Sequence, residues 1–125
     1  MNAWLAVLLG GGVGSVCRYG VVRLATAAGA TLFPWGTLAV NVVGSLLAGV
    51  AYALLAERMN AAPEWRALAM AGFLGGFTTF SAFSLETVRL AEDGHVAAAL
   101  SNMALNLVLC LAACALGLLL VRRYA

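Results

Sequence analysis

Aromatic and hydroxyl side chains share one helical face in the later part of an apolar stretch. Phe80, Phe83, Ser84 and Thr87 stand at positions i, i+3, i+4 and i+7, which fall on the same side of a helix. An aromatic ring has a negative face and a positive edge, so ring edges beside hydroxyl groups can attract a small anion without a formal charge that would retain it. Aromatic residues at this spacing also pack helices together. The pattern therefore indicates either helix packing or weak coordination of an anion.

Polar side chains, including three amides, form two further stripes in other apolar stretches. Thr37, Asn41 and Ser45 lie on one helical face of the second stretch, and Asn102 and Asn106 lie on one face of the last. Polar groups at membrane depth are costly, which makes them informative. Hydrogen bonds between helices, worth about 0.6–2 kcal/mol each, are one explanation. The other is a polar pathway in which the amide groups of Asn41 or Asn106 donate to an anion.

A glycine pair precedes two threonines in the third apolar stretch. Gly75 and Gly76 give a flexible backbone, and Thr78 and Thr79 are β-branched residues with hydroxyl groups. A helix can break here if the freed carbonyl groups find partners, and carbonyls at a break can hold a small cation. A continuous helix, with the hydroxyl groups bonded back to the preceding turn, fits the same residues. The local sequence leaves both structures open.

Few ionisable side chains lie within or beside these stretches. Arg18 either extends to the membrane interface or lends positive potential to an anion entrance. Glu86 and Arg89 are three residues apart, and we expect them to pair. Cys110 and Cys114 lack a third ligand for a metal site. The chain has no nucleophile–base set, phosphate-binding loop or carboxylate pair, so we expect it not to be an enzyme.

The elements that must position these residues are membrane-spanning helices. Of the 125 residues, 64% are hydrophobic and 10% are charged, whereas a soluble domain carries about a quarter charged residues. The seven basic residues are too sparse for a nucleic-acid surface. A spanning helix needs about 20 mostly apolar residues. We therefore predict one all-α integral membrane domain over residues 1–125, with spans at about 3–26, 36–56, 66–89 and 96–121.

Basic residues near the ends of the predicted spans are nearly balanced between the two sides of the membrane. The side with both termini has four and the other side has three: Arg58, Arg66, Arg122 and Arg123 against Arg18, Arg23 and Arg89. Basic residues in short loops normally favour the cytoplasmic side, so a balanced chain can insert in both orientations and form an antiparallel homodimer. Four helices fill their own interior, so a path for a solute also favours an oligomer.

Three segments carry a recognisable pattern that together covers much of the chain. They are Gly10-Gly-Gly-Val-Gly-Ser-Val-Cys-Arg-Tyr19, Pro34-Trp-Gly-Thr-Leu-Ala-Val-Asn-Val-Val-Gly44 and Gly72-Phe-Leu-Gly-Gly-Phe-Thr-Thr-Phe-Ser-Ala-Phe-Ser84. With these segments the chain resembles the Fluc/CrcB family of small fluoride channels over nearly its full length. The resemblance implies a four-span protein of the bacterial inner membrane whose third helix is broken near Gly75–Thr79. It also implies an antiparallel homodimer with two pores, through which fluoride leaves the cytoplasm passively.

The resemblance also implies roles for individual residues. Phe80 and Phe83 are similar to paired phenylalanines whose ring edges contact fluoride in the pore, and Asn41 is similar to a pore asparagine. Gly75 and Thr78 match residues whose backbone carbonyls, from both subunits, hold a structural sodium ion. The remaining matches are a polar track and vestibule of Ser84, Thr37 and Glu86, and a basic residue near the entrance, Arg18.

The last predicted span departs from the family pattern. Asn102 and Asn106 stand where several relatives place Tyr and Ser, and Cys110 stands near a position of Ser. Both asparagines remain candidates for the fluoride pore, since an amide can donate to an anion.

A small proton-coupled exporter of cations or drugs is the alternative, because such proteins also have four spans. It needs a membrane carboxylate that binds the cation and exchanges it for protons. The first, second and fourth predicted spans contain no acidic residue, and Glu86 lies toward the end of the third. The sequence therefore favours the fluoride channel. The resemblance implies a structural sodium ion at the dimer interface as its cofactor, and no organic cofactor.

Overall fold

The computed structural model describes all residues 1–125 and contains helices without any strand. The elements are α1 (Ala3–Ala27), α2 (Trp35–Ala51), η1 (Tyr52–Arg58), α3 (Pro63–Arg66), η2 (Ala67–Leu74), α4 (Gly75–Phe77), α5 (Phe80–Glu92) and α6 (Val96–Tyr124). They combine into four spans long and apolar enough to cross a membrane, namely Ala3–Ala27, Trp35–Arg58, Pro63–Glu92 and Val96–Tyr124. The prediction of an all-helical chain with four such spans is confirmed.

The spans begin and end where local chemistry dictates. Asn2 caps α1, because its side-chain oxygen accepts a hydrogen bond of 2.8 Å from the backbone N–H of Leu5. The chain leaves α1 through Gly29 and leaves α5 through Gly94, with φ angles of 100° and 85°. A side chain would be strained at these positive angles, so glycine permits both turns. Pro63 opens α3 at a position that needs no backbone donor.

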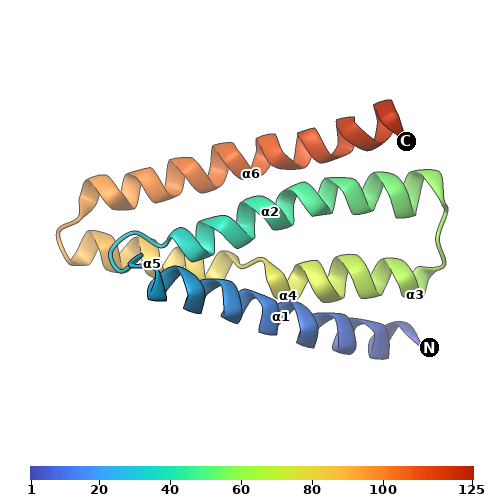
Figure 1. Cartoon of the computed structure of the whole chain (residues 1–125), viewed down its shortest axis with the longest axis horizontal. Coiled ribbons are helices and arrows are strands. Elements are labelled where there is room, and N and C mark those ends of the chain that lie inside the picture. The colour runs from blue at the N-terminus through green and yellow to red at the C-terminus, as the bar shows by residue number, and fades with distance from the viewer.

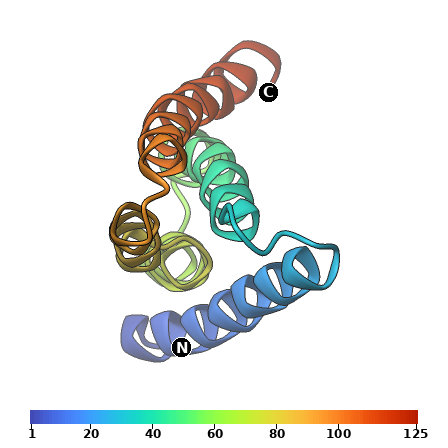
Figure 2. The ribbon, with the colours of Figure 1, turned by 90° about the vertical axis from the view of Figure 1, so that its left-hand side faces the viewer.

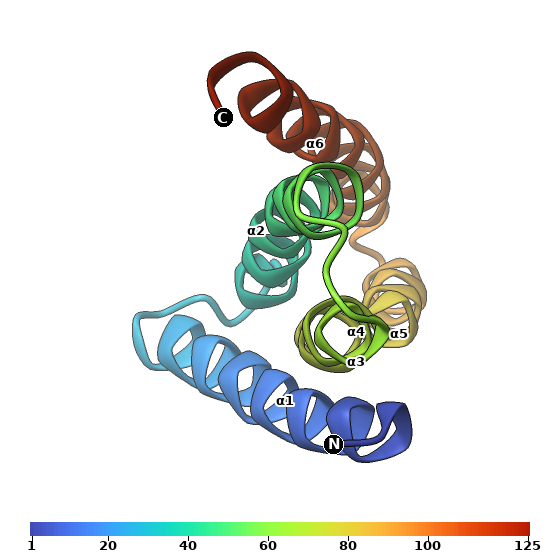
Figure 3. The ribbon, with the colours of Figure 1, turned by 90° about the vertical axis from the view of Figure 1, so that its right-hand side faces the viewer.

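Neighbouring spans alternate in direction, so both termini lie at the same end of the molecule and the α1–α2 and α5–α6 connections lie at the other (Figure 1). The two end-on views show α1 and α6 on the outside, with α2 and the third span between them (Figures 2 and 3). α1 packs against η2 and α4, whereas α6 packs against α2 and α5. Only 20 of the 125 residues are buried, so most of this thin bundle faces outward.

Glycines allow the packed helices to approach until their backbones touch. A Cβ atom at Gly14 would collide with the carbonyl group of Phe73, so α1 lies directly against the third span. A Cβ atom at Gly49 would collide with the carbonyl group of Cys114, so α2 lies equally close to α6. In a membrane, where burial of apolar surface does not drive association, such close packing is a main source of helix attraction.

The third span is the only one with extended residues in its middle. Helical geometry stops after Phe77 and resumes at Phe80, and the two residues between have φ and ψ angles of −89° and 159° for Thr78 and −153° and 126° for Thr79. The axis of α5 is displaced from that of α4, as the end-on view in Figure 3 makes visible. Two extended residues at this depth expose backbone groups that lipid cannot satisfy.

The glycine contacts predict different effects for two substitutions in α1. We expect Gly14→Ala to lower the free energy of unfolding by about 1–3 kcal/mol, since the new methyl group meets the Phe73 backbone and the helices must separate. Gly12→Ala is the matched control, because no atom lies within 4 Å of a Cβ built at Gly12. Unfolding in mixed detergent micelles, followed by tryptophan fluorescence, measures both. Equal stability of the two variants would contradict the packing.

Candidate functional site

Asn41 satisfies the exposed backbone of the third span. Its side-chain oxygen accepts a hydrogen bond of 2.8 Å from the N–H of Thr79, and its Nδ2 donates one of 3.0 Å to the carbonyl of Thr79. Both backbone groups of one extended residue are therefore paired by a single amide from α2. An unpaired polar group at this depth costs several kcal/mol. The two hydrogen bonds with Asn41 therefore stabilise the extended conformation of Thr79.

Two threonine hydroxyl groups close the helix ends on either side of the extended residues. The hydroxyl of Thr78 donates to the carbonyl of Leu74 at 2.8 Å, which ends α4. The hydroxyl oxygen of Thr79 accepts from the N–H of Ala82 at 3.1 Å, which begins α5. Back-bonding of a hydroxyl and interruption of the helix, which the sequence offered as alternatives, thus occur together.

Arg18 lies beside the end of α4. Its Nε donates a hydrogen bond of 3.0 Å to the carbonyl of Gly76, and the side chain is half-buried. A cation at the C-terminal end of a helix is favoured by the helix dipole. The hydrogen bond favours positive potential inside the bundle over extension to the interface. We therefore do not count Arg18 among the basic residues near the ends of the spans. On the side of the membrane opposite the termini, Arg23 and Arg89 remain.

A chain of amides joins the stripes of α2 and α6. Nδ2 of Asn41 donates to Oδ1 of Asn106 at 3.0 Å. Nδ2 of Asn106 donates to the carbonyl and the side-chain oxygen of Asn102, at 2.9 and 3.0 Å. Nδ2 of Asn102 donates to the hydroxyl of Thr87 in α5 at 2.9 Å, and that hydroxyl donates to the carbonyl of Phe83 at 2.7 Å. The structure thus brings the two predicted stripes together.

Phe80 and Phe83 line a cavity together with these amides. Their ring centroids are 5.3 Å apart at an interplanar angle of 57°. The cavity has a volume of about 510 Å³ and also contacts Asn41, Asn106 and both residues of the extended segment. Phe80 is 79% exposed in the single chain, so its ring is available to lipid, to an ion or to another protein chain.

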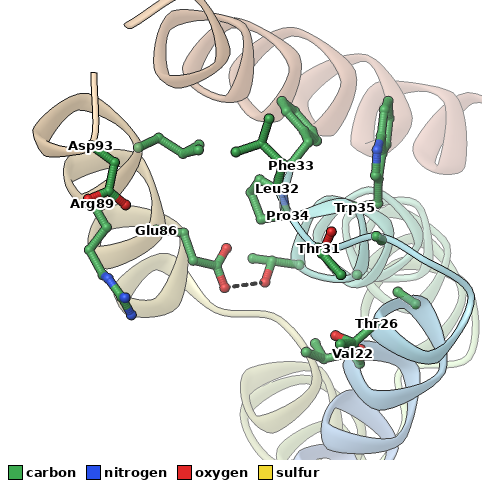
Figure 4. A pocket seen from close by; sticks show the side chains of 15 residues that line it. Val22, Thr26, Thr31, Leu32, Phe33, Pro34, Trp35, Glu86, Arg89 and Asp93 are labelled. Atoms are coloured by element: carbon green, nitrogen blue, oxygen red, sulfur yellow. Dashed lines mark hydrogen bonds between the residues drawn. The ribbon is translucent and has the colours of Figure 1, made fainter. Parts of the chain in front are cut away.

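A second cavity of about 300 Å³ lies at the end of the bundle where α1 connects to α2. The hydroxyl of Thr37 donates to Oε1 of Glu86 at 2.8 Å across this cavity (Figure 4). The other carboxylate oxygen, Oε2, is buried without a partner. Thr37 was matched to the polar track and Glu86 to the vestibule, and the structure brings the two side chains into contact.

The expected ion pair between Glu86 and Arg89 is wrong. Glu86 accepts its hydrogen bond from α2, and Arg89 points away from it (Figure 4). The salt bridge of the chain instead joins Arg122 to Glu57, at 2.6 Å, near the terminal end of the bundle. Neighbours on one helix compete with partners from other helices, and the spacing of the sequence cannot reveal the second kind.

Most polar hydrogens around the larger cavity are used within the chain. Asn41 and Asn106 each donate both Nδ2 hydrogens to oxygens of the protein. The hydroxyl of Ser84 donates to the carbonyl of Phe80 at 2.8 Å, and Ser84 lines neither cavity. An anion in the larger cavity therefore meets ring edges that are free and amide hydrogens that must exchange partners.

The carbonyl groups before the interruption lose their usual helical donors, and Gly75 and Thr78 are among them. The N–H of Thr79, which would bond the carbonyl of Gly75 in a helix, bonds Asn41 instead. The N–H of Ala82, which would bond the carbonyl of Thr78, bonds the hydroxyl of Thr79. Carbonyl oxygens freed at an interrupted helix suit a hard cation such as sodium. No cluster of three or more His, Cys, Asp or Glu side chains offers another metal site.

Sequence reasoning missed the role of Thr79. Its backbone groups anchor Asn41, and its hydroxyl caps α5, but only Thr78 was matched to a functional role. A threonine that precedes an apolar helical run is a typical N-cap, so the signal was present. Ser45, one turn after Asn41, also lines the larger cavity.

Comparison with known proteins gives concordant matches. The family model described as CrcB-like protein, Camphor Resistance (CrcB), matches residues 5–118. A protein of Coxiella burnetii named Fluoride-specific ion channel FluC is 46% identical over 120 residues, which covers 95% of this chain and 97% of the relative. Proteins with the same name from Rhizobium etli and Aeromonas salmonicida are 50% and 46% identical over 119 and 121 residues. The matches cover 95% and 97% of this chain and the same shares of those relatives.

The hydroxyl cap of Thr79 leads to a stability prediction. We expect Thr79→Val, which keeps the shape of the side chain but loses the acceptor for Ala82, to lower the free energy of unfolding by about 1 kcal/mol. Thr79→Ser keeps the oxygen and should remain close to the wild type. The midpoint of unfolding in mixed micelles measures both, and a Val variant as stable as the Ser variant would refute the cap.

Proposed function

Because the chain belongs to the CrcB family, and its relatives carry the name of fluoride-specific ion channels, we propose that it conducts fluoride across a membrane. The observation that carries this proposal is the larger cavity, where the rings of Phe80 and Phe83 lie beside the amide of Asn41 without any formal charge on the lining. Weak contacts of this kind attract an anion and still release it. Ion channels as a class are not enzymes.

Fluoride would pass the exposed ring edges of Phe80 and Phe83 and the amide of Asn41. Thr37 and Ser84 extend this polar track, and Asn102 and Asn106 lie behind Asn41 on α6. Arg18 and Glu86 would form the vestibule, where the charge of Arg18 raises the local concentration of anions. The hydrogen bonds within the chain support this path, since each amide hydrogen can leave a protein oxygen for the ion and return.

Export along this path would need no energy source. A membrane potential of about 100 mV, negative inside, favours the outward movement of a monovalent anion by about 2.3 kcal/mol. A passive channel in the bacterial inner membrane would therefore lower the fluoride concentration of the cytoplasm, as the resemblance implies.

A second copy of the chain would cover the open side of the cavity. Phe80 is 79% exposed although it lies next to buried amides, and a single chain leaves the path open along one side. The family resemblance implies that the partner lies antiparallel, which gives two equivalent pores. The loop charges of four against two basic residues are a weak bias that permits both orientations.

The carbonyls of Gly75 and Thr78 would hold a sodium ion between the two copies. Both have lost their helical donors, as described above, and Gly75 lies exposed on the outside of the chain. Two carbonyls from each copy would give a set of hard oxygen ligands. The ion would supply positive charge that offsets the freed carbonyl dipoles and ties the copies together.

Anion-resolved flux tests the function. Liposomes containing the purified protein and loaded with fluoride are expected to release it rapidly, whereas liposomes loaded with chloride retain it. Electrodes selective for each ion measure the two rates, and protein-free liposomes are the control. Equal release of both ions, or of neither, would refute the proposal. Proton-dependent cation uptake without fluoride release would instead support the exporter.

The aromatic pair gives a second functional prediction. We expect Phe80→Ile and Phe83→Ile each to slow fluoride release roughly tenfold, since losing a ring-edge contact of about 1–1.5 kcal/mol raises the barrier by that amount. Phe73→Ile is the matched control in the same span, because Phe73 stacks on Phe77 and does not line the cavity. Size-exclusion chromatography checks that each variant assembles like the wild type. Unchanged fluoride release in both pore variants would refute the proposed contact between the aromatic rings and the ion.

A further inference from the structure

The amide chain behind the larger cavity has a fixed direction. Both Nδ2 hydrogens of Asn106 point to Asn102, one to its backbone carbonyl and one to its side-chain oxygen. Oδ1 of Asn106 therefore faces Asn41 as an acceptor. Rotating the Asn106 amide by half a turn would set two NH2 groups against each other and leave the side-chain oxygen of Asn102 without a donor. The contacts with Asn102 thus determine which atom Asn41 meets.

The orientation of Asn41 follows from three contacts. Its oxygen is bound by the N–H of Thr79, one of its Nδ2 hydrogens by the carbonyl of Thr79, and the other by Asn106. If the amide rotated, its oxygen would face the oxygens of Thr79 and Asn106. Asn106 therefore contributes one of the three bonds that fix the orientation of the Asn41 amide.

The same chain connects α6 to α5. Asn102, which is 0% exposed, donates to the hydroxyl of Thr87, and this hydroxyl donates to the carbonyl of Phe83. The amides thus reach the third span at two points, the extended Thr79 and the turn that carries Phe83. Loss of Asn106 would disconnect α6 from Thr79 while the contact near Phe83 remained.

We infer that Asn106, supported by Asn102, is a positioning residue that orients the amide of Asn41 and does not itself bind the ion. Both amide hydrogens of Asn106 are bonded to Asn102, so an anion could take one only by breaking the contacts that orient Asn41. The role in conduction rests on the proposed function, whereas the effect on Thr79 does not. Two independent readouts therefore separate the failure of one from the failure of the other.

The first readout is hydrogen–deuterium exchange of the Thr79 N–H in the full-length protein, resolved by NMR with threonine-selective labelling. Asn106→Leu keeps the size of the side chain and removes every amide contact. We expect it to speed exchange at Thr79 about five- to tenfold, the effect of losing one buried hydrogen bond from the set that holds Asn41. Asn106→Ser keeps exchange within about twofold of the wild type, because a hydroxyl can donate to the Asn102 carbonyl and still accept from Asn41.

The second readout is fluoride release from liposomes. We expect Asn106→Leu to slow it about as much as it speeds exchange at Thr79, and Asn106→Ser to preserve it. Ser101→Ala is the matched control, since Ser101 also lies on α6 but is exposed and lines neither cavity. It should leave both readouts unchanged. If Asn106→Leu does not assemble, Asn106→Ala removes the same bonds with a smaller side chain.

Slower release with unchanged exchange at Thr79 would mean that Asn106 contacts the ion directly, and would overturn the inference. Faster exchange with unchanged release would overturn its role in the pore. If Asn106→Leu changed neither exchange at Thr79 nor fluoride release, Asn106 would have no role in orienting Asn41 or in the pore. If the wild type releases no fluoride, the proposed function fails, and exchange at Thr79 still decides whether Asn106 orients Asn41.

Discussion

The pairing of the Asn41 amide with the backbone of Thr79 is the interaction on which the rest of the structure depends. A membrane offers no water to satisfy an interrupted helix, so the two extended residues in the third span exist only because other parts of the chain bond their polar groups. Asn41 from α2 and the hydroxyl of Thr79 itself do this for the start of α5. Arg18 from α1 bonds a carbonyl at the end of α4. Two other helices, α1 and α2, thus converge on one short segment of the third span.

This convergence explains why so many polar side chains in the bundle carry no free donor. Their hydrogens donate to backbone oxygens at the interrupted helix or to oxygens within the chain of amides behind it. What remains free beside the larger cavity is the hydroxyl of Ser45 and the pair of phenylalanine rings, whose contacts are individually weak. An ion channel gains from this arrangement, because an ion held by exchangeable hydrogen bonds and ring edges can also leave.

Close helix packing is the condition for such convergence. Glycines at Gly14 and Gly49 bring α1 and α2 within backbone contact of their neighbours, so side chains as short as asparagine and threonine can reach across. The bundle is too thin to bury an open path in its own interior. Phe80 and Gly75 instead lie exposed on the outside of the single chain.

Much of this protein follows from its sequence alone. The four spans are a matter of counting apolar residues, because the length of a membrane helix is set by the thickness of the bilayer. The three segments at residues 10–19, 34–44 and 72–84 identify the family, which the comparisons confirm. The polar stripes of α2 and α6 follow from helical spacing, which depends only on local geometry. The partners of individual side chains did not follow: Glu86 bonds Thr37, 49 residues away, and not the adjacent Arg89.

The conformation in the middle of the third span could not be predicted from the sequence. Glycines and threonines tolerate a helix and an extended segment almost equally, so the local sequence leaves the geometry of Thr78 and Thr79 undecided. The tertiary structure decides it, since Asn41 lies 38 residues away in the chain and pairs with Thr79 only after α2 has packed against the third span. Sequence determines where helices cross the membrane because that choice is local. The local sequence does not determine where a helix is interrupted, because the hydrogen bonds that stabilise the interrupted backbone come from other helices.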